Sequence, residues 1–180
     1  MNKIINNIGR YALVLTFGLG INNNAIAEKR LDMPNLIYQS RYNEFDNYFD
    51  NYSKDNPDDI NENKFKALLV SIAQKESSLG FPNGKKKNTF MLMGYGNPKD
   101  RKNYGIENQL KLSSNCLKNA FNEENSNYKE SFDKEGDKKI KAILSIYNQG
   151  EINDEGINYA NEVYSDYLKW NNYFEKELKP

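Results

Sequence analysis

The chain contains no histidine and only one cysteine, Cys116, among its 180 residues. Without histidine, the usual Ser-His-Asp and Cys-His catalytic arrangements are excluded, and so are zinc sites that use imidazole ligands. One cysteine can form neither an intramolecular disulfide nor a four-cysteine metal site. Hydrolytic chemistry in this chain would therefore rest on carboxylates, hydroxyls, lysine or a hard metal bound by carboxylates.

The charge balance argues against a nucleic-acid partner. The 25 basic and 25 acidic residues give a formal net charge of +0, so the chain has no basic bias that would favour binding to phosphates. Hydrophobic residues make up 38% of the chain and aromatic residues 13%. The aromatic content in particular is higher than in disordered segments, which contain few aromatic residues. This composition and length predict one domain with a substantial core.

The N-terminus has the pattern of an export signal. Lys3 and Arg10 form a positive region that precedes an apolar run over 11–21, and this run is shorter than a membrane-spanning helix needs. A small-x-small cleavage site ends at Ala27, so residues 1–27 are predicted to be a signal peptide that is cleaved there. We therefore expect a periplasmic or secreted protein without stable membrane insertion after cleavage; an uncleaved anchor is the alternative.

The spacing of apolar residues predicts a mainly α protein. Aromatic residues recur at spacings of three and four between 38 and 52, so the N-terminal lead-in, 28–62, is predicted to be partly helical up to a break near Pro57. Further helices are predicted over 63–78, 104–121, 137–149 and 157–174. The glycine-bearing segment 79–103 predicts an irregular loop or small β segment within a main domain over 63–178.

The same periodicity predicts which side chains face the core. In the helix over 157–174, the inward positions are predicted to be Ala160, Val163, Tyr164, Tyr167 and Leu168. Cys116 is predicted to be a small buried apolar residue.

Glu76 is the candidate catalytic residue, at the end of the helix over 63–78. Apolar residues between 68 and 73 precede it by eight, seven, four and three positions, which places its carboxylate on the apolar face of the helix. Glutamate is rarely buried without a function, and a carboxylic acid that stays protonated near neutral pH is what glycosidic bond cleavage needs. The alternative is that Glu76 faces water at a fraying helix end, just before Gly80.

Three short motifs follow one another along the chain. They are Lys75-Glu76-Ser77-Ser78, then Phe90-Met91-Leu92-Met93-Gly94-Tyr95-Gly96, then Ile146-Tyr147-Asn148-Gln149-Gly150 followed by Tyr159-Ala160-Asn161-Glu162-Val163. In this order they resemble the lysozyme-like superfamily, in particular the soluble lytic transglycosylases. That family carries a Glu-Ser at a helix end, a Gly-Leu-Met-Gln stretch, an Ala-Tyr-Asn-Ala-Gly segment and a Tyr-Ala-x-x-Val helix. The middle motif is also similar to secreted glucosaminidase-like proteins of bacteria.

Two positions depart from the family pattern. The stretch that ends at Gly94 lacks the glutamine of the family, and Ser145-Ile146 replaces the small residue expected before Tyr147. These departures concern contacts with the glycan more than they concern the acid.

The resemblance implies a lysozyme-like single domain that cleaves peptidoglycan glycan strands without a cofactor or metal. Glu76 would act as general acid and then as general base at the bond between N-acetylmuramic acid and N-acetylglucosamine. In a lytic transglycosylase the muramyl 6-hydroxyl then attacks, whereas a lysozyme or glucosaminidase uses water, often with a second carboxylate. Asp100 and Glu107 are the nearest downstream candidates for that carboxylate, although surface charges are the more usual role of acidic residues.

By the same resemblance, six residues would contact substrate: Ser77, Met93, Tyr95, Gln109, Tyr147 and Asn148. Each has a structural alternative, namely polar filler at the helix end for Ser77, core packing for Met93, Tyr95 and Tyr147, a satisfied inner-edge amide for Gln109, and a helix cap for Asn148. The sequence leaves both sets of roles open.

The sequence is also compatible with two other functions. The protein could be a non-catalytic binding or scaffold protein of the envelope that has kept the fold, because fold and function can separate. It could also be an accessory cell-wall enzyme of a secretion machine, with residues 28–62 docking an envelope protein partner.

Overall fold

The computed structural model of the chain describes residues 33–81, 92–93, 105–122 and 136–177. All of them belong to one compact unit, residues 32–180. Its helices are α3 (Leu36–Tyr42), α4 (Asp46–Ser53), α5 (Glu62–Ser77), α6 (Ile106–Phe121), α8 (Asp137–Gln149) and α9 (Asp154–Glu177). The described residues contain no β-strand, so the prediction of a mainly α protein is confirmed. Within these same ranges, no helix combines the length and apolar character needed to cross a membrane.

Asparagine side chains cap the start of three helices, of which Asn35 at α3 is the first. The Asn61 side chain accepts a hydrogen bond of 2.9 Å from the backbone N–H of Lys64 at the start of α5. At α9, the side chain of Asn153 accepts one of 2.8 Å from Gly156 N–H. Such caps satisfy N–H groups that have no partner within the helix. The α9 cap moves the helix start to Asp154, three residues before the predicted start, despite the glycine at position 156.

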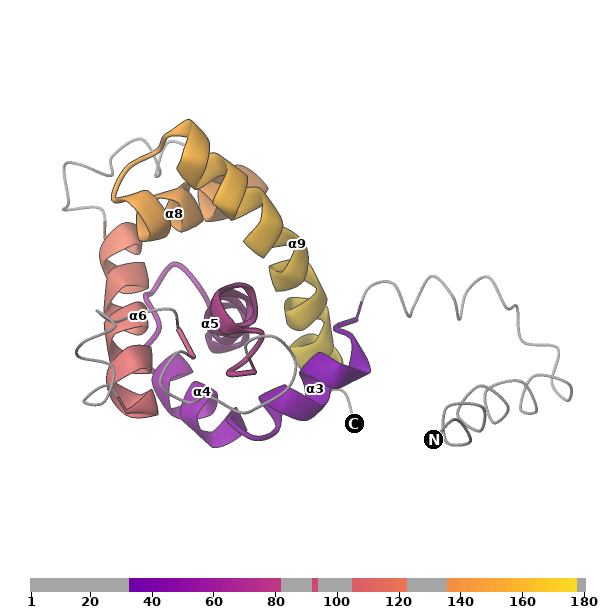
Figure 1. Cartoon of the computed structure of the whole chain (residues 1–180). Coiled ribbons are helices and arrows are strands. Elements are labelled where there is room, and N and C mark those ends of the chain that lie inside the picture. Colours follow the sequence, from indigo (N-terminus) through magenta and orange to yellow (C-terminus); the bar gives the residue numbers. More distant parts are fainter. Residues whose placement is uncertain (1–32, 82–91, 94–104, 123–135, 178–180) are drawn as a thin grey trace, which may run out of the picture. The chain divides into compact units, whose positions relative to one another are not determined.

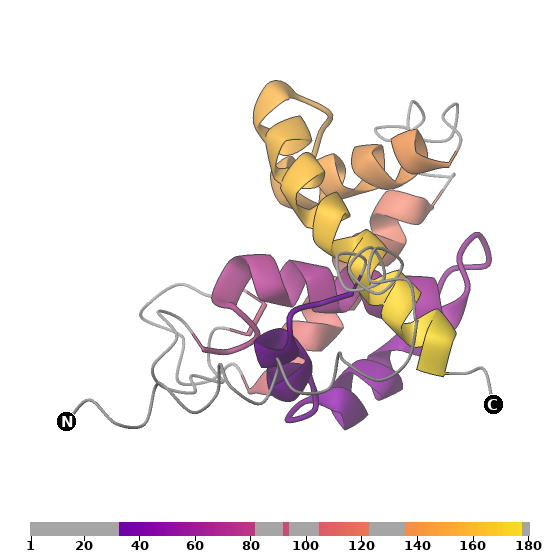
Figure 2. The same ribbon diagram turned by 90° about the vertical axis from the view of Figure 1, so that its right-hand side faces the viewer.

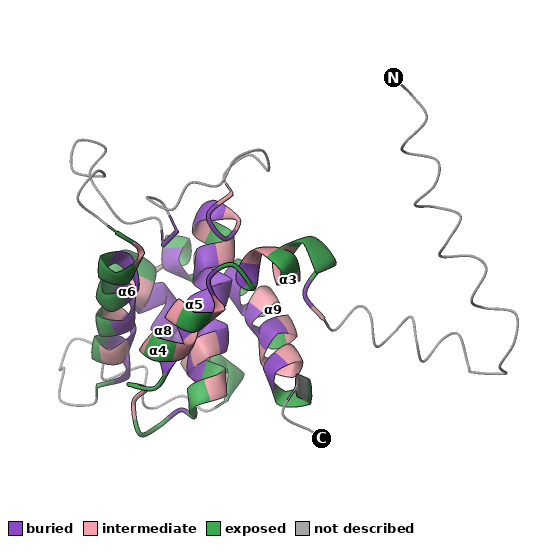
Figure 3. Ribbon diagram, turned by 90° about the horizontal axis from the view of Figure 1, so that it is seen from below, coloured by how far each residue is buried: buried purple, intermediate pink, exposed green. Residues whose placement is uncertain are grey.

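Helix α5 is the central element of this unit. Figure 1 shows it end-on, with α3, α4, α6, α8 and α9 around it. Every residue from 67 to 73 is buried, so α5 has no solvent-facing side along this stretch, as the colours of Figure 3 show. A helix that is apolar on all sides belongs inside a core, and burying each large aliphatic side chain stabilises the fold by about 1.5–3 kcal/mol.

The aromatic stripe of the lead-in packs on the last helix. The Tyr42 ring lies 5.3 Å, centroid to centroid, from both Trp170 and Phe174, and these two α9 rings stack 5.7 Å apart. The indole Nε1–H of Trp170 also donates a hydrogen bond of 2.9 Å to the side chain of Gln74 in α5. The helical stripe predicted over 38–52 is therefore present as α3 and α4, and it shares one core with the helices after residue 62.

A close approach joins α8 to the start of α9, the hairpin at the top of Figure 2. A Cβ atom added at Gly156 would lie 2.1 Å from Ser145 Oγ and 3.1 Å from Ser145 Cα. The Ser145 hydroxyl itself donates a hydrogen bond of 3.0 Å to the backbone carbonyl of Glu151 in the connecting loop. The absence of a side chain at Gly156 thus lets the two helices approach, and it fixes the position of the first turns of α9.

Two predictions about burial are wrong. Leu168 was predicted to face inward, but it is 49% exposed. The buried face of α9 runs through Val163, Tyr167 and Trp170 at spacings of three and four, and this leaves Leu168 on its edge. Cys116 is partly exposed instead of buried, because the inward position of α6 at this level is taken by the neighbouring Leu117.

Candidate functional site

Glu76 lies in the last turn of α5 and is held by a residue from α9. Its Oε1 atom accepts a hydrogen bond of 2.9 Å from the hydroxyl of Tyr159, and both side chains are half-buried. The apolar spacing predicted a position on the apolar face of the helix, and the structure places Glu76 at the edge of that face, where it is half-buried. The middle of α5 is buried on every side, so its apolar residues do not define one buried face. The apolar pattern therefore does not show that the last turn of α5 extends out of the core.

The Tyr159 hydrogen bond orients the carboxylate. A phenol that donates to one carboxyl oxygen restricts the rotation of the glutamate side chain. Glu76 is thereby held in one orientation beside solvent, as a group that transfers protons to a bound molecule must be.

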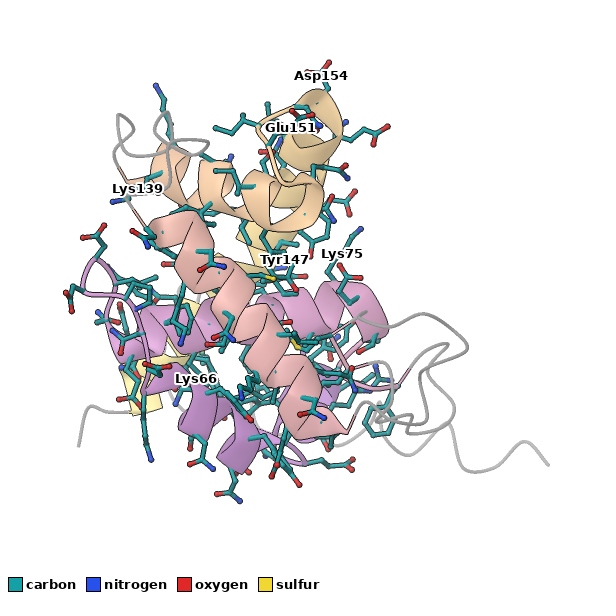
Figure 4. All side chains as sticks on the ribbon, turned by 90° about the vertical axis from the view of Figure 1, so that its left-hand side faces the viewer. Lys66, Lys75, Lys139, Tyr147, Glu151 and Asp154 are labelled. Atoms are coloured by element: carbon teal, nitrogen blue, oxygen red, sulfur yellow. The ribbon has the colours of Figure 1, made fainter. Side chains whose placement is uncertain are left out.

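A second contact between the same two helices lies next to this pair. Lys75, labelled in Figure 4, forms an ion pair with Glu162 on α9. Both side chains are exposed, so the pair alone stabilises the fold by at most about 1 kcal/mol. Consecutive residues of α5 nevertheless bind residues that stand one turn apart on α9, which fixes the relative register of the two helices at Glu76.

The backbone turns sharply just after Glu76. Ser78, Leu79 and Gly80 have φ angles of 53°, 57° and 77°, so three consecutive residues adopt the left-handed conformation. Non-glycine residues there cost on the order of 1–3 kcal/mol each and are held by surrounding structure, frequently at functional sites. Part of that support comes from the Ser77 hydroxyl, which accepts a hydrogen bond of 2.8 Å from Gly80 N–H and lies 2.8 Å from the Leu92 carbonyl oxygen.

Three of the predicted substrate-binding residues are buried in the described structure. Ser77, Met93 and Gln109 are at most 4% exposed, and the side-chain oxygen of Gln109 accepts a hydrogen bond of 3.1 Å from Met93 N–H. These contacts fasten residues 92–93 to α5 and α6 behind the turn. Met93 therefore fills core, and the three residues support the Glu76 turn from inside.

Two others lie at the end of α8. The hydroxyl of Tyr147, which Figure 4 labels, lies 3.1 Å from the hydroxyl of Ser113 on α6 and joins the two helices. Asn148 is exposed, and its side-chain oxygen accepts a hydrogen bond of 2.7 Å from the amide of Gln149. Tyr95 lies outside the described residues, so its predicted role stays a prediction.

Of the two candidates for a second carboxylate, the structure describes only Glu107. Glu107 is exposed in the first turn of α6, and its charge acts on Tyr52 of α4. Burial first, and then this charge, raises the pKa of Tyr52 above its usual value. Glu107 therefore acts on the α4 side of α6 as a solvated surface charge, while Asp100 lies outside the described residues.

Tyr159 belongs to the Tyr-Ala-x-x-Val motif, from which no role for its side chain is predicted. A signal for it lies in the pattern Tyr159-Ala160-x-x-Val163, because Ala160 and Val163 are predicted to face inward, and both are fully buried in the structure. A tyrosine beside such positions sits at the edge of the buried face, where its ring packs and its hydroxyl seeks a polar partner. What the pattern could not supply is the identity of that partner.

A separate hollow of about 350 Å³ lies near the N-terminal ends of α5 and α8, away from Glu76 at the C-terminal end of α5. Its lining includes Asp59, Asp137, Lys139, Tyr164 and Tyr167, and the ammonium of Lys139 pairs with the Asp59 carboxylate at 2.9 Å. Burial, with the nearby charges of Glu175 and Asp137, raises the pKa of Tyr167 to about 12. Lys139 and Asp59 thus pair with each other in this hollow, whereas the buried side-chain oxygen of Asn171 in its lining has no hydrogen-bond partner among the described residues.

Comparisons of the chain with protein-family models, with curated proteins and with solved structures found no match. The described ranges also hold no group of three or more cysteine, aspartate or glutamate side chains placed to bind a metal ion.

Proposed function

We propose that this protein is a lysozyme-like enzyme that cleaves the glycan strands of bacterial peptidoglycan, with Glu76 as general acid and base. The observation that carries the proposal is the Glu76–Tyr159 hydrogen bond of 2.9 Å at the emerging end of the central helix. The strained turn that follows, at Ser78 and Leu79, adds support, because such strain clusters at active sites.

In this proposal the substrate bond is the β-1,4 linkage between N-acetylmuramic acid and N-acetylglucosamine. Glu76 gives its proton to the bridging oxygen as the bond from that oxygen to the muramyl anomeric carbon breaks, and the N-acetylglucosamine part leaves with a free 4-hydroxyl. The Glu76 carboxylate then takes the proton of the attacking hydroxyl. Tyr159 donates to this carboxylate and stabilises it between the two proton transfers.

We favour a lytic transglycosylase, in which the attacking hydroxyl is the muramyl 6-hydroxyl and the product is a 1,6-anhydro sugar. This reaction needs no second carboxylate from the enzyme. The exposed amide of Asn148 is suited to bind an acetamido group, and Ser77, Met93 and Gln109 hold the turn behind Glu76. The signal peptide expected over 1–27 would take the enzyme to the compartment that contains its substrate.

The test is mass spectrometry of the fragments that the mature chain, residues 28–180, releases from purified peptidoglycan. Anhydromuramyl ends that disappear in Glu76→Gln would support the transglycosylase. Reducing ends would mean hydrolysis, and the sugar that carries them would separate a lysozyme from a glucosaminidase. Glu62→Gln is the matched control, since it neutralises an exposed carboxylate at the other end of the same helix and should keep activity.

A second candidate, a non-catalytic binding or scaffold protein of the envelope, is favoured by one observation. Leu36 and Ile37 at the start of α3 are 78% and 59% exposed, and adjacent exposed apolar side chains are typical of docking surfaces. Saturable binding to purified sacculi, with no soluble fragments after long digestion, would support this candidate and contradict the enzymatic one.

A further inference from the structure

We propose that Arg41, in the helix that precedes the predicted catalytic domain, is a positioning residue for Glu76. This inference rests on the proposed function, because it concerns the geometry of the proposed acid. It makes α3 a working part of the active site, although the sequence assigned that helix to a lead-in.

Arg41 spans from α3 to the turn that ends α5. Its Nη1 donates a hydrogen bond of 3.0 Å to the backbone carbonyl of Ser78. The guanidinium carbon lies 4.9 Å from the centroid of the Phe81 ring and 5.6 Å from that of Tyr38. The two rings and the carbonyl together hold one planar cation in a single place. The planar guanidinium of arginine fits such a site better than the ammonium of lysine does.

The turn that Arg41 contacts has a specific need for such a partner. Backbone N–H groups of Ser78, Leu79 and Phe81 donate back to carbonyls of Gln74, Ala73 and Ser77, at 2.8, 3.1 and 2.9 Å. Those bonds use the carbonyls inside the helix, whereas the Ser78 carbonyl lies beyond its last turn and accepts from Arg41. A positive group there also complements the partial negative charge at the C-terminal end of α5.

The turn after α5 determines where Glu76 is held. Glu76 stands two residues before Ser78, and its link to Tyr159 is one hydrogen bond of 2.9 Å that weakens steeply when the atoms separate. Ser78 and Leu79 have φ angles that non-glycine residues avoid, so they would relax if their restraint were removed. Relaxation would unwind the last turn of α5 and move the carboxylate away from the phenol.

The experiment compares Arg41→Ala, Arg41→Lys and Lys66→Ala in the mature chain. Lys66 is the matched control, because it is, like Arg41, a half-buried cation beside an aromatic ring, 4.5 Å from the centroid of Phe174. Its hydrogen-bond partner is the carboxylate of Asp50, at 2.9 Å. Lys66 lies ten residues before Glu76 in α5, away from the turn. The readouts are kcat and KM on glycan strands, and hydrogen exchange of the backbone amides over 74–81.

We expect Arg41→Ala to lower kcat on the order of tenfold with little change in KM, because misplacement of a catalytic group by about an ångström can cost that much or more. Exchange over 74–81 should become faster, and Arg41→Lys should restore part of the rate. Lys66→Ala should lower the melting temperature and leave kcat unchanged. The Arg41→Ala loss should largely vanish in a Tyr159→Phe background, since both changes disturb the same carboxylate.

Other outcomes would overturn the inference. If Arg41→Ala only lowers stability and keeps kcat, or if its effect adds in full to that of Tyr159→Phe, Arg41 is structural and the proposed function stands. If the wild-type protein releases no fragments, the proposed function fails and the positioning role fails with it.

Discussion

The hydroxyl of Tyr159 donates a hydrogen bond of 2.9 Å to Glu76 Oε1, and so joins the last helix of the chain to the end of the central one. Because α5 and α9 also meet through Lys75 and Glu162, the carboxylate is placed by two helices and not by one. The orientation of Glu76 should therefore respond to changes on either helix, and this is open to test.

Removing the Tyr159 hydroxyl should reduce activity without unfolding the protein. Tyr159→Phe keeps the ring and deletes the bond to Glu76, so we expect kcat to fall on the order of tenfold as the carboxylate loses its fixed orientation. Tyr48→Phe on α4, also half-buried, is the control and should keep wild-type kcat. Equal rates for Tyr159→Phe and wild type would show that the hydrogen bond has no role in the reaction.

Gly156→Ala should destabilise the protein by about 1–3 kcal/mol, because the added methyl group would collide with Ser145 and push α8 and α9 apart. Denaturant unfolding measures the change. Gly105→Ala is the control, since a Cβ there meets nothing within 4 Å and its φ of −61° suits alanine. A Gly156→Ala protein as stable as Gly105→Ala would mean that the two helices are not held at this distance.

Ser77→Ala should cost about 1–3 kcal/mol of unfolding free energy, because it leaves the buried N–H of Gly80 without its acceptor. Ser71→Ala is the matched control in the same helix, where the hydroxyl bonds only back to the Ala67 carbonyl and removal should cost less. Chemical denaturation of both variants decides the comparison. Similar losses for the two serines would argue against a special role of Ser77 in the turn.

Stability should fall between pH 10 and about 12. The pKa of Tyr167 is raised to about 12, mainly by burial, and that of Tyr164 is also raised, by burial and then by its hydrogen bond to Asp137. A group whose pKa is raised by folding contributes its full stability below its unfolded pKa, and that contribution is lost as the pH rises through the folded value. Only the unfolded state gains by ionising in this range.

Tyrosinate absorbance at increasing pH, followed together with unfolding, tests this prediction. Part of the absorbance should appear only near pH 12, and Tyr167→Phe should lose less stability over the same range. Ionisation of every tyrosine near pH 10, in a protein still folded, would contradict the assignment.

The sequence predicted helix positions well where local signals agree. The expected helix over 137–149 is α8 itself, and the one over 63–78 differs from α5 by one residue at each end. In both, apolar residues keep the helical period and a turn former stands at the end, Gly150 in one case and Gly80 in the other. These signals are local, so a single sequence contains them.

The candidate site was less predictable, because its geometry depends on contacts between distant parts of the chain. The position of Glu76 at a helix end followed from spacing, but its partner Tyr159 and the contact of Arg41 with Ser78 did not. Nothing in a helical period states which neighbouring helix will supply a donor. The exposure of Leu168 shows the same limit, since the neighbours of α9 decide where its buried face ends.

The packing of Tyr42 against Trp170 and Phe174 also has a consequence for how the chain folds. It brings together the first and last described helices, so the core cannot close until the C-terminal helix has been synthesised. Contacts of such large sequence separation slow folding, because a long loop must close before they form. A chain whose last helix is cut short should therefore fail to complete its core, even though Glu76 and the turn after it lie far upstream of the missing residues.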